Sequence, residues 1–126
     1  MGRHYDGDIS GKFWLGIQSS DDADFFGVIG EPPTSDLYYC FNNNNLGKVK
    51  KGIETCKKEL GIYKEKIDKF FKNLESGWNE EMLVDLLGIN RNKVDRLMEW
   101  YARLELGQKI MDCIVKNGEC SFDAEI

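Results

Sequence analysis

The feature that most constrains this chain is a run of apolar residues spaced alternately four and three positions apart within residues 48 to 74. A period near 3.5 residues places such side chains along one side of a helix, as in a coiled coil. We therefore predict one long, heptad-like helix here, or two helices bent near Gly61. Two uses of the apolar side stay open, core packing within the chain and the seam of a homodimer or larger oligomer. The run consists of Val49, Ile53, Cys56, Leu60, Tyr63, Ile67, Phe70 and Leu74.

Two further helices are expected in the second half of the chain. The first has Asn79 as its N-cap and stops at Gly88, because a short polar side chain caps the first turn and glycine ends the last one. The second extends over about residues 90 to 116 and ends at Gly118. Its inner face is expected to carry Val94, Leu97, Tyr101, Leu104, Met111 and Val115.

Three segments alternate apolar and polar residues in the way that half-buried strands do, namely residues 11–18, 36–42 and 119–126. In the first of them the alternation puts Phe13, Leu15 and Ile17 on one face and Lys12, Trp14 and Gln18 on the other. The prediction is an α+β fold in one domain, residues 1–126. A small antiparallel sheet of three strands, an N-terminal hairpin-like pair plus the C-terminal strand, packs against about three helices.

Length and cysteine spacing indicate a soluble cytoplasmic protein. A chain of 126 residues can bury one hydrophobic core without disulfides. No apolar run approaches the roughly 18 residues of a membrane span, and the start MGRHYDGD lacks the apolar stretch of a secretion signal. The four cysteines form no CxxC pair, and His4 is the single histidine, so neither a zinc site nor a disulfide framework is expected.

The segment from Arg3 to Gly27 is the preferred recognition surface, because it gathers Asp, Ser, Trp and Gln around a single expected strand. We expect a non-enzymatic binding protein with no cofactor and no catalytic residue. Trp14 is either covered by a helix or available to stack on a ligand ring. Asp8 and Trp14 are expected to bury little of the core, so that replacing either would abolish binding without lowering stability. The binding residues of this hypothesis are His4, Asp6, Asp8, Lys12, Trp14, Gln18, Ser19, Ser20, Asp21 and Asp22.

A metal-assisted hydrolase is one alternative for the same segment. Clustered carboxylates can hold a divalent ion, and the acids available are Asp6, Asp8, Asp21 and Asp22. The spacing of Asp6, Asp8 and the following Ser10 and Gly11 also matches the first half of a calcium loop. The second half does not match, because Ile17 stands where a bidentate Glu is required. No metal is therefore assigned.

A helix-turn-helix DNA-binding regulator is the other alternative, in the stretch MLVDLLGINRNKVDRL. Here Arg91, Asn92, Lys93 and Arg96 would face the DNA. The second helix is longer than a recognition helix and the chain carries a net charge of -5, which disfavours nucleic acid as a partner. The charge is uneven, however, because residues 48 to 74 hold nine lysines against four acids.

The two ends of the chain, YDGDISGKFWLGIQSSDDADFFG and ELGQKIMDCIVKNGECSFDAEI, resemble a group of small proteins of unassigned function in viral, phage and bacterial genomes. The resemblance is looser through the middle helices and brings no catalytic residues with it. It implies a viral accessory protein, in the host cytoplasm, that binds a host macromolecule or sequesters a small ligand. The identity of that partner, protein or small molecule, is left open.

Overall fold

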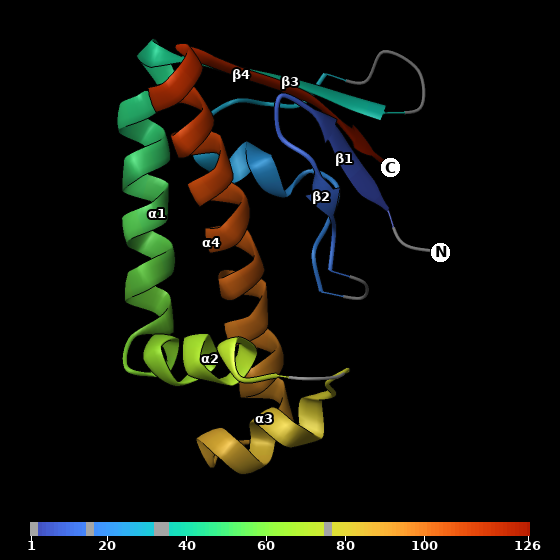
Figure 1. Ribbon diagram of the computed structural model, residues 1–126, viewed down its shortest axis with the longest axis vertical. Coiled ribbons are helices and arrows are strands. Elements are labelled where there is room, and N and C mark those ends of the chain that lie inside the picture. The colour runs from blue at the N-terminus through green and yellow to red at the C-terminus, as the bar shows by residue number, and fades with distance from the viewer. Residues whose placement is uncertain (1–2, 15–16, 32–35, 75–76) are drawn as a thin grey trace.

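A computed structural model describes residues 3–14, 17–31, 36–74 and 77–126 of the chain. Two helices stand side by side, a twisted sheet covers their upper part, and two shorter helices lie across their lower end (Figure 1). In chain order the elements are β1 His4–Gly7, β2 Gly11–Lys12, η1 Asp22–Phe26, β3 Asp36–Asn42, η2 Asn43–Asn45, α1 Leu46–Leu60, α2 Tyr63–Lys72, α3 Glu80–Leu87, α4 Arg91–Asn117 and β4 Glu119–Glu125.

The apolar run of residues 48 to 74 forms two helices rather than one. Gly61 ends α1 with a φ of 54°, a conformation that side-chain-bearing residues avoid, and α2 then turns across the lower end of α1 and α4 (Figure 1). The predicted bend at Gly61 is confirmed. The run is largely enclosed within the chain, since α1 packs along α4 and five of the eight residues of the run are buried, namely Val49, Ile53, Cys56, Leu60 and Ile67.

The helices α3 and α4 begin and end where local sequence signals predict. The side chains of Asn79 and Asn90 accept hydrogen bonds from the backbone N–H groups of Met82 and Lys93, respectively. Gly88 and Gly118 close the two helices in the left-handed conformation. The prediction that Val115 lies on the inner face of α4 is wrong, since this side chain is 67% exposed. Beyond Leu104 the buried residues of α4 are instead Leu106, Gly107, Ile110, Cys113 and Ile114.

The sheet has four antiparallel strands in the order β2-β1-β4-β3, and not the three that were expected. The N-terminal strands therefore do not pair as a hairpin with β3. Instead β4 lies between β1 and β3, and pairs Tyr5 with Ala124 on one side and Tyr39 with Phe122 on the other. The predicted strand over residues 36–42 is confirmed, and the C-terminal one ends at Glu125.

The strand expected over residues 11–18 is wrong beyond Lys12. The backbone N–H groups of Ile17 and Gln18 both donate to the carbonyl oxygen of Trp14, at 3.1 and 2.9 Å, so the chain turns back instead of extending. Leu15 lies outside the described residues. The missed strand, β1, has only one buried side chain, that of Tyr5, and so shows no alternation in the sequence.

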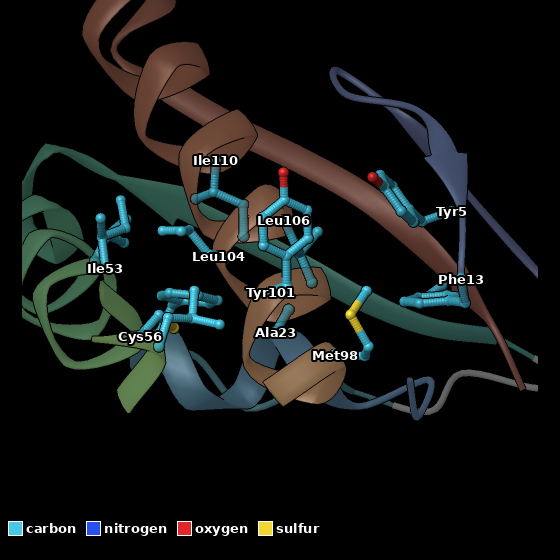
Figure 2. Packing of buried hydrophobic residues seen from close by; sticks show 14 of the residues in the cluster. Tyr5, Phe13, Ala23, Ile53, Cys56, Met98, Tyr101, Leu104, Leu106 and Ile110 are labelled. Carbon is cyan, nitrogen blue, oxygen red and sulfur yellow. The ribbon is translucent and has the colours of Figure 1, made fainter. Parts of the chain in front are cut away.

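The core lies between the helix pair and one face of the sheet. Along β3 and β4 the buried side chains alternate with exposed ones, so that Tyr39, Phe41 and Phe122 stack in the core while the other face meets solvent. Side chains from α1, α4 and the N-terminal segment meet here (Figure 2). The short helix η1 inserts Phe26 between α1 and α4, where Gly52 and Gly107 leave room for its ring. In the described ranges, no helix is long and apolar enough to cross a membrane.

Candidate functional site

The polar residues of the N-terminal segment do not form one surface. His4, Asp6 and Asp8 lie at the exposed side of the sheet beside β4. The imidazole Nδ1 of His4 is 3.4 Å from a carboxylate oxygen of Glu125, and a carboxylate oxygen of Asp8 accepts the backbone N–H of Ser121 at 2.9 Å. Asp8 therefore helps to attach the β1–β2 turn to the central strand.

A second group is buried and holds the segment on α4. The Asp22 carboxylate accepts hydrogen bonds from the amide of Gln18 and from the guanidinium of Arg103, each at 2.8 Å. Gln18 also donates to the backbone carbonyl of Ala102 at 3.4 Å. The alternating pattern placed Gln18 on an outward face, but both Gln18 and Asp22 are buried because the chain turns inward after Trp14.

The same segment is fixed from the other side by Arg3. Its guanidinium donates to the Ser20 hydroxyl at 2.6 Å and to the backbone carbonyl of Gln18, and it lies over the Phe13 ring. Ser19 donates to the exposed Asp21 carboxylate at 2.7 Å, which is a local bond across two residues. Gln18, Ser20 and Asp22 thus act as anchors of the N-terminal segment, and the structure assigns them contacts within the chain.

Trp14 belongs to an aromatic cluster that joins the N-terminal segment to the helices. Its ring centroid lies 5.6 Å from Phe71 of α2, 5.8 Å from Trp78 and 6.1 Å from Tyr101 of α4. The Tyr101 hydroxyl donates to Asp68 of α2 at 2.8 Å, which ties the cluster to the lower end of the fold. The expectation that Trp14 points away from the core is therefore wrong, although the side chain is only partly buried.

An open cleft of about 550 Å³ lies beside this cluster. The N-terminal segment supplies one wall with Lys12, Phe13, Trp14 and Ile17, and the start of α3 and of α4 supplies the other with Trp78, Asn79, Glu80 and Arg91. This volume is in the range of sites that hold small molecules. Of the predicted binding residues, the cleft brings together Lys12 and Trp14.

The charges of the cleft are set at its α3–α4 wall. The guanidinium Nε of Arg91 lies 2.8 Å from a carboxylate oxygen of Glu80. Hydrogen bonds with Asp95 and then with Arg91 lower the pKa of Glu80, while the contact with Glu80 raises the pKa of Asp95. Glu80 is therefore ionised at neutral pH, and its carboxylate neutralises the Arg91 guanidinium. Lys12 remains as the exposed cation on the opposite wall, and in the described chain it forms no ion pair.

Sequence reasoning missed two residues that matter for this arrangement. Trp78 lines the cleft, yet in the sequence it reads only as an apolar residue ahead of the Asn79 cap. Arg103 anchors Asp22, and nothing local signals a pair of residues 81 positions apart. One signal for the cleft was available in the sequence. Trp78 directly precedes the helix cap Asn79, in a segment with no apolar periodicity that would place it in the core.

The structure also shows where the residues lie that the metal-assisted hydrolase and the helix-turn-helix regulator would use. The carboxylate of Asp22 is committed to Gln18 and Arg103, away from Asp6 and Asp8 on β1 and its turn. Within residues 3–14, 17–31, 36–74 and 77–126, no three His, Cys, Asp or Glu side chains gather as ligands for a metal ion. For the DNA-binding hypothesis, Arg91 is paired with Glu80, while Asn92, Lys93 and Arg96 line a separate hollow described below.

Comparison with protein families, with curated proteins and with solved structures found no match to this chain.

Proposed function

We propose that this chain is a non-enzymatic binding protein whose tryptophan cleft, defined by Lys12, Trp14, Trp78 and Arg91, captures a small planar ligand with a negative group. The observation that carries the proposal is the cleft itself, in which two indole rings, 5.8 Å apart between centroids, stand beside an exposed lysine. Aromatic walls bury a flat apolar molecule, and one well-placed polar group fixes its orientation.

The charge balance of the cleft favours an anion over a cation. Glu80 and Arg91 neutralise each other at 2.8 Å, so Lys12 leaves the cleft with one net positive charge. A ligand carboxylate or sulfonate would pair with the Lys12 ammonium while its ring system lies against Trp78. The protein acts as a sequestering or sensing protein rather than as a catalyst on this proposal.

We also propose that the protein resides in the cytoplasm, where thiols stay reduced. All four cysteines are free thiols, and three of them are buried. Reduced, buried cysteines are usual in the cytoplasm, and for a viral accessory protein this would be the cytoplasm of the host.

The test uses the three tryptophan indole N–H signals in a ¹H–¹⁵N spectrum during titration with naphthalene-2-sulfonate. We expect saturable shifts of the Trp14 and Trp78 signals, while the Trp100 signal stays in place as an internal control. The neutral naphthalene-2-methanol should bind at least tenfold more weakly. Lys12→Gln should remove that preference for the anion, whereas Lys116→Gln, with the same change of net charge, should not.

Shifts of all three indole signals to a similar extent would indicate nonspecific adsorption and would overturn the proposal. Equal affinity for the sulfonate and the alcohol would remove Lys12 from the site. If no small anion or neutral aromatic binds below millimolar concentration, the cleft is not a ligand site.

A further inference from the structure

A second surface runs along the outer groove between α1 and α4, where η1 is inserted. We call it the basic strip and define it by Lys48 and Lys51 of α1, Lys93, Arg96 and Trp100 of α4, and Phe25 of η1. It contains two hollows. One, of about 420 Å³, is lined by Lys93, Arg96 and Trp100 among others, and the other, of about 230 Å³, by Phe25, Lys48 and Lys51 among others.

Phe25 joins the two hollows into one surface. Its ring centroid lies 5.5 Å from that of Trp100, and its ring edge lies beside Gly52 of α1, so it bridges the two helices. Lys48 continues the strip on the far side of Phe25, where its side chain lies against Gly27. With a rise of about 1.5 Å per residue, the eleven positions from Lys48 to Glu59 along α1 span about 16 Å. The strip is thus long enough for several nucleotide units rather than for one ion.

The charge of the strip is available to a partner. Lys48, Lys51, Lys93 and Arg96 are all exposed, and none of them forms an ion pair with a carboxylate in the described parts of the chain. Among the described residues, Glu59 is the one acid that lines either hollow. The Arg103 guanidinium, by contrast, is neutralised by Asp22 and serves to hold Trp100, whose ring it covers at 4.5 Å.

We propose that the basic strip binds single-stranded nucleic acid, with phosphates at the four cations and bases against Trp100 and Phe25. The aromatic rings stand between the cations, as in surfaces that follow a single strand and stack its unpaired bases. A duplex keeps its bases paired and would use the cations alone. An acidic peptide would likewise leave the rings unused. The net charge of -5 had argued against nucleic acid, but of the 22 acids in the chain Glu59 is the one among the residues that line the two hollows, so the negative charge lies mainly outside this surface.

The test is fluorescence anisotropy with fluorescein-labelled twelve-nucleotide oligothymidylate and oligouridylate over a range of salt concentrations. Four phosphate contacts predict that the logarithm of the binding constant falls with the logarithm of salt with a slope of about -3, since each contact contributes roughly -0.7 for a single strand. Lys51→Gln with Arg96→Gln should weaken binding and make the slope shallower by about 1.4. Trp100→Leu should weaken binding by roughly 5- to 150-fold through loss of stacking.

The matched control is Lys50→Gln with Lys116→Gln, which changes the net charge equally. Lys50 lies two residues after Lys48 and so about 200° around α1, away from the strip. The control should keep wild-type affinity and slope. In the ¹H–¹⁵N spectrum the oligonucleotide should shift the Trp100 indole signal and leave those of Trp14 and Trp78 unmoved, which separates this surface from the tryptophan cleft. Melting temperatures establish that each variant is folded.

Three results would overturn the proposal. One is absence of binding at 50 mM salt, and another is an equal loss of affinity in the control variant. The third is affinity for a duplex of the same length, or for polyglutamate, that matches affinity for the single strand, because either would leave Trp100 and Phe25 without a role.

Discussion

Asp22 shows how one carboxylate can attach a whole segment to the fold. Its side chain is 4% exposed and accepts two hydrogen bonds, one from Gln18 in its own segment and one from Arg103 of α4, whose side chain is 22% exposed. Because both charges are largely removed from water, removal of one leaves the other without compensation. The neighbouring Asp21 is exposed, and among the described residues its carboxylate accepts a hydrogen bond from Ser19 alone.

We predict that Asp22→Ala destabilises the protein by about 3 kcal/mol, since breaking a buried ion pair from one side costs on the order of 3 to 5 kcal/mol and Arg103 retains some solvent access. Asp21→Ala removes the same charge at the adjacent position and should change stability by no more than about 0.5 kcal/mol. Urea unfolding of both variants at pH 7 measures the difference. Equal destabilisation by the two substitutions would show that Asp22 is not the anchor.

The sequence could not distinguish these two aspartates. In the run SSDDADFFG any of the polar side chains can cap the short helix that follows, so a local interpretation treats Asp21 and Asp22 alike. What separates them is Arg103, 81 residues away, and such a pairing depends on the tertiary arrangement of η1 against α4. The same holds for Trp14, whose partners Phe71, Trp78 and Tyr101 come from three later segments.

At the scale of elements, the spacing of α1 and α4 depends on two glycines. Gly52 and Gly107 both lie against the Phe26 ring, and a β-carbon at Gly107 would overlap that ring. Phe26 is fully buried and also contacts Phe25, so it has little room to move aside. A glycine inside a helix costs stability relative to alanine, and here the packing of η1 accounts for its presence.

We predict that Gly107→Ala lowers stability by about 1 to 2 kcal/mol, because overpacking costs roughly 1 to 3 kcal/mol and outweighs a gain of up to about 1 kcal/mol in helix propensity. Gly47→Ala is the control, since it also lies in a helix but a β-carbon there would meet nothing within 4 Å. It should stabilise the protein by about 0.4 to 1 kcal/mol. Thermal unfolding followed by circular dichroism compares the two, and a stabilising Gly107→Ala would contradict this account of the packing.

The helix ends and the strands β3 and β4 could be predicted because their signals are local, whereas β1 and the order of the strands in the sheet could not. Asn79, Gly88, Asn90 and Gly118 each act within one helical turn of their own position. The strand β1 has the polar sequence HYDG and exists because β4 pairs with it. The alternation of residues 11–18 correctly indicated that Phe13 is buried. It does not extend as a strand, because the backbone turns after Trp14.

At the scale of the whole molecule, the core holds several weak acids in their protonated form. Burial, followed by the hydrogen bond to Asp24, raises the pKa of Tyr39, and burial followed by the bond to Asp68 raises the pKa of Tyr101. Burial raises the pKa of the Cys56 thiol to about 12 and also raises the pKa of Cys120. All four groups therefore ionise more readily in the unfolded chain than in the folded one.

We predict that stability is constant near neutral pH and falls as pH rises above about 9. An acid with a raised pKa in the folded state stabilises the fold fully below its unfolded value, here 9.0 for cysteine and 10.0 for tyrosine, and this contribution is lost toward its folded value. The urea midpoint from pH 7 to 11 tests the direction. Tyrosinate absorbance from Tyr39 and Tyr101 should appear together with loss of helical circular dichroism, and Tyr39→Phe should make the decline shallower.

Full tyrosinate absorbance near pH 10 with the helices intact would show that Tyr39 and Tyr101 are open to solvent. Because Tyr39 is buried and stacks with Phe41 and Phe122, we expect the opposite outcome.

The position of β4 in the sheet has a consequence for how the chain acquires its structure. β4 follows every other described element along the chain, yet both β1 and β3 find their ladder partner in it. Hydrogen bonds between the first strand with its turn and the last strand, such as His4 to Glu125 and Ser121 to Asp8, close loops of 121 and 113 residues. Such distant closures are entropically costly and slow. During synthesis the helices can form early on the ribosome, while β1 and β3 cannot form their ladders with β4 until β4 has emerged.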